Sequence, residues 1–149
     1  MYKHLLISTD GSDLAKKGVD HGLALAKAIG AKTTLITVTE VLLPYIVGAT
    51  ESATVSNYNY REYLDIQKEA AERVLARARE EALAMGLEAD AVCFEQGSPA
   101  QAIVETAKAR GCDLVVMSSH GRRGVRRLML GSVASEVLAL SETPVLVVR

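Results

Sequence analysis

DLVVMSSHGRRGVRRLMLGSVASEVL, residues 113–138, is the stretch that most constrains the fold. Its apolar run over residues 113–118 is typical of a strand buried in a parallel sheet, and the pattern from Ser132 onward predicts a helix. A loop rich in glycine and arginine joins the two. Glycines let backbone amides approach an anion, and the first amides of a helix carry a partial positive charge. The stretch therefore predicts a phosphate site between strand and helix.

Two familiar phosphate signatures do not fit this loop. A P-loop needs four residues between its glycines and then lysine, whereas six residues separate Gly124 from Gly131 and Leu130 precedes that second glycine. A dinucleotide fingerprint needs three spaced glycines after the first strand, where the chain has Gly11 between Asp10 and Ser12. Both interpretations are excluded.

The loop is similar instead to the nucleotide loop of the universal stress protein family, whose ATP-binding members carry G-x2-G-x9-G-(S/T). Gly121, nine further residues, and then Gly131 and Ser132 match the second glycine, the third glycine and the hydroxyl residue. Ser118 stands at the first glycine position, where a Cβ crowds a ribose or phosphate. Family members without the full pattern are often not ATP binders.

The resemblance covers nearly the whole chain, because residues 3–12, 97–99 and 143–148 also look like this family. It implies a single domain over residues 1–149 with a Rossmann-like open parallel sheet. The implied strand order is 3-2-1-4-5, with helices on both faces.

The chain itself predicts an α/β fold, because short apolar runs alternate with helical patterns. Strands are expected over residues 4–8, 33–38, 89–94, 113–118 and 145–148, and helices over residues 12–30, 60–85, 98–111 and from 132 onward. Gly18 and Gly22 are expected to let the first helix pack closely on the sheet. Ser98 is expected to cap the third helix, with Pro99 at its first position and Gln101 completing a capping box. The long irregular stretch over residues 39–59 folds over a ligand, meets a partner or is mobile.

Ligands of open α/β sheets bind beyond the carboxyl ends of the strands, where connections diverge to opposite faces. The implied strand order places this point between the first and fourth strands, so that Asp10 faces the loop. Asp10 matches the family's acidic residue, and its carboxylate either accepts a ribose hydroxyl or holds a Mg²⁺ ion that bridges phosphates. The alternative role of Asp10 is to cap the first helix with Ser12. Val38 matches the position whose backbone meets adenine.

The resemblance and the loop together predict the nucleotide-binding residues. The amides of Gly121, Gly131 and Ser132 are the expected phosphate donors, since amides at a helix start are already ordered. His120 is expected to shape the loop, because neither a nucleophile nor a second carboxylate lies near it in sequence. The arginines of the loop, Arg122, Arg123, Arg126 and Arg127, either contact phosphates or form a solvated basic face. The complete set is Ser8, Thr9, Asp10, Val38, Met117, Ser118, His120, Gly121, Arg122, Gly131, Ser132 and Val133.

Composition narrows the class of protein. Of the 149 residues, 49% are hydrophobic and 23% charged, and the net charge is −1, which argues against disorder and against a general attraction to nucleic acid or anionic membrane. Cys93 and Cys112 lie beside apolar segments and are expected to be buried free thiols of a reducing cytoplasm. The histidines are isolated, so no metal-ligand spacing occurs. No apolar stretch approaches the roughly 18 residues of a membrane span, so a soluble cytoplasmic protein is expected.

The leading functional prediction is a non-enzymatic adenine-nucleotide module of the stress response that binds ATP or AMP. One alternative is a dimeric stress protein that binds no nucleotide and acts through protein partners. Another is a slow ATP hydrolase or phosphotransferase, for which His120 is the only candidate base in the loop. The strand over residues 145–148 is expected at a sheet edge, apolar and unprotected, and the resemblance implies a homodimer in which it pairs with its counterpart. A loop that covers this edge would instead leave a monomer.

Overall fold

Five parallel strands form one sheet in the computed structural model, which describes residues 1–39, 53–95, 97–121 and 129–149. The sheet order is β3-β2-β1-β4-β5, as the resemblance implied. Every strand lies within one residue of its predicted bounds at either end: β1 (His4–Ser8), β2 (Lys32–Thr39), β3 (Ala89–Glu95), β4 (Leu114–Ser118) and β5 (Val145–Val148). The predicted α/β fold class is confirmed.

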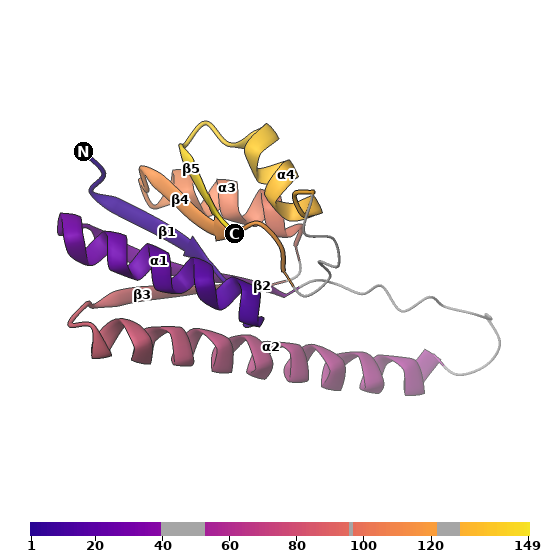
Figure 1. Ribbon diagram of the computed structural model, residues 1–149. Helices are drawn as coiled ribbons and strands as arrows, with labels where there is room; N and C mark the ends of the chain where they lie inside the picture. Colours follow the sequence, from indigo (N-terminus) through magenta and orange to yellow (C-terminus); the bar gives the residue numbers. More distant parts are fainter. Residues whose placement is uncertain (40–52, 96, 122–128) are drawn as a thin grey trace.

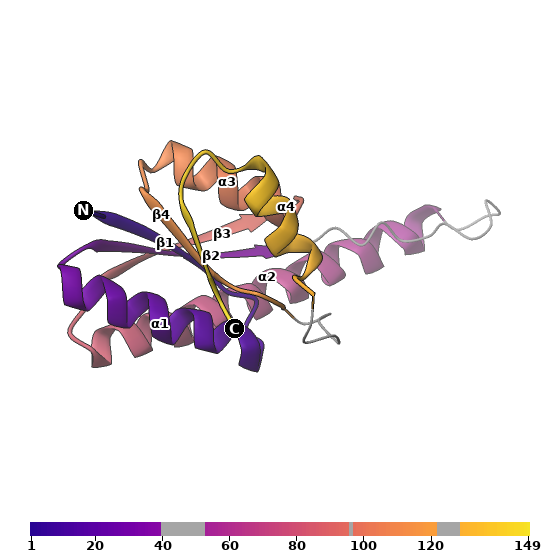
Figure 2. The same cartoon turned by 45° about the horizontal axis from the view of Figure 1, so that its top comes forward.

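Two helices cover each face of the sheet (Figures 1 and 2). On one face, α1 (Asp13–Ile29) and α2 (Ala53–Ala84) bury Leu5 and Ile7 of the central strand. On the other face, α3 (Pro99–Ala109) and α4 (Ser132–Leu140) bury Leu6. Because side chains alternate along a strand, a central strand buried on both faces is a continuous apolar run.

The first helix packs closely on the sheet through its glycines, as predicted. A Cβ built on Gly18 would lie 3.0 Å from the Ser118 backbone nitrogen, and one on Gly22 would lie 2.6 Å from Cδ1 of Ile7. Ser12 caps the helix by accepting a hydrogen bond from the Ala15 amide at 3.1 Å. Gly30 ends it in the left-handed conformation, with φ of 68°.

Two helix starts differ from their predictions. The second helix begins at Ala53 rather than near residue 60, so residues 53–59 of the expected irregular stretch are helical, and residues 40–52 lie outside the described residues. The first turns of α2 extend beyond the sheet (Figure 2), and the sequence of residues 53–59 has no apolar stripe from which a helix could be predicted. Ser98 occupies the N-cap of α3 and Pro99 follows, but the Ser98 side chain makes no capping hydrogen bond, so the capping-box prediction is wrong.

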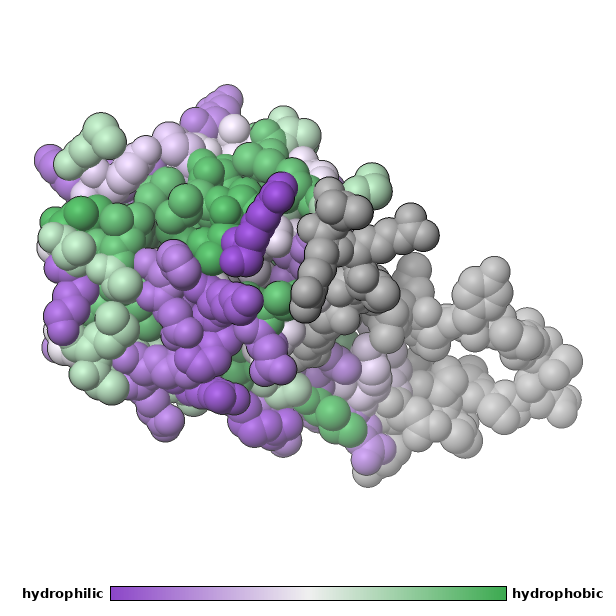
Figure 3. Space-filling view, in the orientation of Figure 1, coloured by the Kyte–Doolittle hydropathy of each residue, from purple (hydrophilic) through white to green (hydrophobic). Residues whose placement is uncertain are grey.

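Hydrophobic side chains gather over β5 on the face shown in Figure 3. The strand is an edge of the sheet, and its Leu146 side chain is 38% exposed.

Both cysteines are free, as predicted; Cys112 is buried and Cys93 is half-buried. Burial raises the pKa of the Cys112 thiol to about 11. Among the described residues, none of the helices has the length and apolar character needed to cross a membrane.

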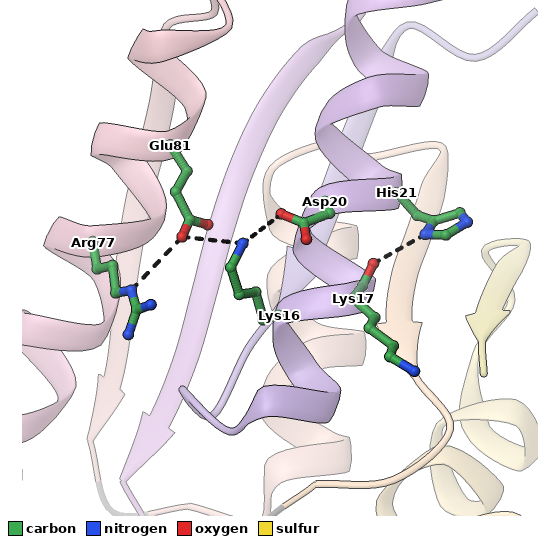
Figure 4. Close-up of polar contacts among 6 residues, drawn as sticks. All are labelled: Lys16, Lys17, Asp20, His21, Arg77 and Glu81. Atoms are coloured by element: carbon green, nitrogen blue, oxygen red, sulfur yellow. Dashed lines mark hydrogen bonds and ion pairs between the residues drawn. The ribbon is translucent and has the colours of Figure 1, made fainter.

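Ion pairs on the surface link α1 to α2 (Figure 4). The Lys16 ammonium lies 2.9 Å from an Asp20 carboxylate oxygen and 3.4 Å from one of Glu81, which also lies 3.7 Å from the Arg77 guanidinium. The hydrogen bond to Asp20 is the main cause that raises the pKa of Lys16. Exposed pairs of this kind stabilise a fold by about 1 kcal/mol or less, so the buried core holds the two helices in place.

Candidate functional site

A cavity of about 380 Å³ lies at the carboxyl ends of β1, β2 and β4, between α2 and the first turns of α3 and α4. This is the point where the chain turns to opposite faces after β1 and β4, which is where open α/β sheets bind ligands. Every predicted site residue that the structure describes lines this cavity: Ser8, Thr9, Asp10, Val38, Met117, Ser118, His120, Gly121, Gly131, Ser132 and Val133. Arg122 and the other loop arginines lie outside the described residues.

Hydrogen bonds hold the described part of the loop after β4. The Ser119 amide donates to the Val148 carbonyl at 2.7 Å, which ties the loop to β5. The Ser118 hydroxyl donates to the His120 carbonyl at 2.6 Å, and the Ser119 hydroxyl lies 3.1 Å from Nδ1 of His120. The serine at the first glycine position therefore braces its own loop, and both the backbone and the ring of His120 take part in shaping it.

One expected phosphate donor has another partner. The Gly131 amide donates to the Ser119 carbonyl at 2.8 Å. The sequence could not show this, because the bond joins two residues that are twelve positions apart. The Gly131 amide closes the turn in this structure, and its role as a phosphate donor stays a prediction.

The start of α4 lines the cavity. Gly131 is the N-cap, and having no side chain it makes no capping bond, in contrast to Ser12 at the start of α1. The first amides of a helix have no partner within the helix itself. Those of Ser132 and Val133, both lining the cavity, therefore remain as donors with the partial positive charge of a helix start.

Asp10 connects β1 to this loop. Its Oδ1 accepts a hydrogen bond from the Ser12 amide at 3.0 Å, which shapes the turn before α1, while Ser12 itself caps the helix. Its Oδ2 lies beside Gly121, and a Cβ added there would collide with that oxygen. The glycine thus lets the loop backbone approach the carboxylate closely. Asp10 serves the turn and also faces the cavity.

The two sides of the cavity differ. The side toward α3 and α4 is apolar, with Ile36, Val38, Ile103, Met117 and Val133. The side toward α2 is lined by Thr37, Thr39, Tyr63, Gln67, Ala70, Ala71 and Val74. None of these residues belongs to the predicted nucleotide-binding set. One signal could have found the α2 residues: positions 63, 67, 70, 71 and 74 follow the spacing of one helical face.

The described residues contain no group of three or more His, Cys, Asp or Glu side chains placed to hold a metal ion. Among the described residues that line the cavity, Asp10 is the one with a carboxylate. Mg²⁺ is commonly held by one or two carboxylates together with substrate phosphates, so a magnesium ion would fit here only with a phosphate-bearing ligand.

Fold and site together define a class: an open parallel α/β protein with a ligand cavity between a carboxylate after the first strand and the uncapped start of a helix. The sequence model of the universal stress protein family matches residues 1–149, and the chain belongs to this family.

Relatives resemble the chain over its full length. It is 32% identical to universal stress protein YxiE of Bacillus subtilis, with all of both chains covered. The solved structure of protein MJ0577, from Methanocaldococcus jannaschii, is 27% identical, covers 99% of this chain and 96% of its own, and superposes with a TM-score of 0.79. A crystal structure of a universal stress protein in complex with cAMP is also 27% identical, with coverage of 99% and 97% and a TM-score of 0.71.

Proposed function

We propose that the protein is an adenine-nucleotide-binding module of the stress response, with ATP or AMP as its ligand. The observation that carries the proposal is the composition of one cavity: an apolar wall, a carboxylate and the uncapped start of α4 all line it. These three features match a heterocycle, a ribose and a phosphate group in turn. The related universal stress protein in complex with cAMP supports the same ligand class.

Each part of the nucleotide has a proposed partner. Adenine lies against Met117 and Val133 and meets the backbone of Val38. The Asp10 carboxylate accepts a ribose hydroxyl, or reaches a Mg²⁺ ion held by the phosphates. The amides of Ser132 and Val133 receive the phosphate nearest the ribose.

Binding is favoured over catalysis by the state of the candidate base. His120 Nδ1 is hydrogen bonded to Ser119, and the described cavity lining has Asp10 as its one carboxylate. A hydrolase needs a group that positions or activates the attacking water. We therefore propose a protein without significant turnover, in which ATP hydrolysis in the presence of Mg²⁺ stays at background. Turnover that Asp10→Ala abolishes would favour the enzyme alternative.

A protein that binds nucleotide tightly retains some through purification. Denaturing the purified protein and analysing the supernatant by mass spectrometry should reveal AMP or ATP, and calorimetry on stripped protein should give a micromolar dissociation constant, equivalent to about −8 kcal/mol. If stripped protein binds neither nucleotide at millimolar concentration, the stress protein that acts through protein partners is the better explanation.

Two further features belong to the same proposal. The free cysteines fit a reducing cytoplasm, which we propose as the location. The exposed apolar edge at β5 fits a homodimer in which two copies of this strand pair.

A further inference from the structure

The cavity extends over the carboxyl edge of the sheet onto both faces. Ile36 and Val38 of β2 point to the α3 and α4 side, whereas Thr37 and Thr39 alternate with them and point to the α2 side. Figure 1 shows α2 continuing past the ends of the strands, and residues of α2 line the second side of the cavity. The proposed adenine position occupies the first side alone. The α2 side is therefore a separate compartment of the same cavity, without an assigned occupant.

The chemistry of this α2 compartment is polar and uncharged. Thr37 is only 5% exposed, and it lines the cavity. Tyr63 and Gln67 stand opposite on α2 and are half-buried, and Ala70 lies one turn further along the helix. A hydroxyl in a cavity wall can donate a hydrogen bond to a ligand and accept one from it.

These side chains suit a heterocycle better than a phosphate. An aromatic ring such as that of Tyr63 stacks on a base, and the amide of Gln67 offers a donor and an acceptor to a base edge. Of the described residues on the α2 side, none is charged, so a phosphate there would lose its hydration without a compensating cation. A purely apolar group would make no hydrogen bond with the Thr37 hydroxyl or the Gln67 amide.

We propose that the α2 compartment binds the second nucleoside of a dinucleotide whose first nucleoside occupies the adenine position. This inference rests on the proposed function, since the phosphates of such a ligand would pass Asp10 and the start of α4 between the two compartments. A dinucleotide of this kind carries an uncharged heterocycle at each end and its charge in the middle. The cavity likewise has an uncharged compartment on each face of the sheet, with Asp10 and the start of α4 proposed to lie along the path of the phosphates.

The experiment compares diadenosine tetraphosphate with ATP by calorimetry on stripped protein. We expect the dinucleotide to bind at least tenfold more tightly, and Gln67→Ala and Thr37→Val each to remove most of that gain while leaving ATP affinity unchanged. Gln101→Ala, which removes the same amide from the exposed surface of α3, is the matched control and should leave both affinities unchanged.

The outcomes separate this inference from the function on which it rests. Equal affinity for the two ligands, or a gain that survives both cavity substitutions, overturns the second-nucleoside site while ATP binding still stands. Failure of both ligands to bind overturns the nucleotide proposal as well. The methyl signal of Thr37 in an NMR titration gives an independent readout, since it should shift with the dinucleotide and much less with ATP.

Discussion

At Gly131 the loop after β4 turns into α4 with no space for a side chain, because an added Cβ would lie 2.9 Å from the Ser119 carbonyl oxygen. That carbonyl accepts the Gly131 amide, so a side chain would also strain the bond that closes the turn. Gly131→Val should move the first amides of α4 away from the cavity and weaken ATP binding at least tenfold, or about 1.4 kcal/mol. Calorimetry measures the affinity, and circular dichroism checks the fold. Ser135→Val, which adds bulk on the exposed side of α4, should bind ATP normally; unchanged affinity in Gly131→Val would remove this loop from the phosphate site.

Ser118, at the other end of this loop, has a side chain that bonds within the loop itself. Its hydroxyl donates to the His120 carbonyl, so Ser118→Gly removes an internal brace and no proposed ligand contact. ATP affinity in Ser118→Gly should therefore stay the same or increase, because the substitution removes a side chain from the cavity wall. Titration of the two proteins under identical salt decides this. A tenfold loss of affinity would mean that the hydroxyl brace is required for binding, and binding gained only by the glycine variant would favour an ATP-free role for the natural protein.

Among the elements, α1 packs on the sheet through two glycines, Gly18 and Gly22. Gly18 lies against the backbone of β4, where a Cβ would be 3.0 Å from the Ser118 nitrogen and 3.3 Å from the Met117 carbonyl carbon. Because backbone cannot move aside as a side-chain end can, Gly18→Ala should push α1 from the sheet and lower the free energy of unfolding by about 1–3 kcal/mol. Urea unfolding measures this change. Lys17→Ala, exposed on the same helix, should leave stability within about 0.5 kcal/mol, and equal stability of Gly18→Ala would show that α1 has room to shift.

The sequence predicted strands well and the α2 side of the cavity poorly, for physical reasons. Strands such as β1 are apolar runs that must be buried on both faces, so their bounds follow from hydrophobicity alone. The glycine spacing after β4 and the carboxylate after β1 predicted that the site lies at the carboxyl ends of these two strands. Tyr63 and Gln67 lie on a helix that approaches this end only through the tertiary fold, and the hydrogen bond from Gly131 to Ser119 likewise depends on how the loop closes. Local pattern cannot report either contact.

At the scale of the whole molecule, β5 is an edge strand, and among the described strands none pairs with its outer side. The Pro144 and Val148 carbonyls accept hydrogen bonds from Val115 and Ser119, so they face β4. Backbone groups alternate along a strand, which places the amide of Val147 on the open side. An apolar edge with outward amides is suited to pairing with a second copy.

Proline at position 147 tests this pairing without breaking the sheet. Val147→Pro removes only an outward donor, and proline is tolerated on edge strands when its missing amide would face solvent. Light scattering at micromolar concentration should give the wild type a mass of twice the single-chain 15.9 kDa and shift the variant toward one chain or toward aggregate. Val147→Ile keeps the amide and should remain dimeric. A wild-type mass near 15.9 kDa would disprove the dimer, and a proline variant that remains dimeric would place the interface elsewhere, because a pair of antiparallel β5 strands needs the donor that proline lacks.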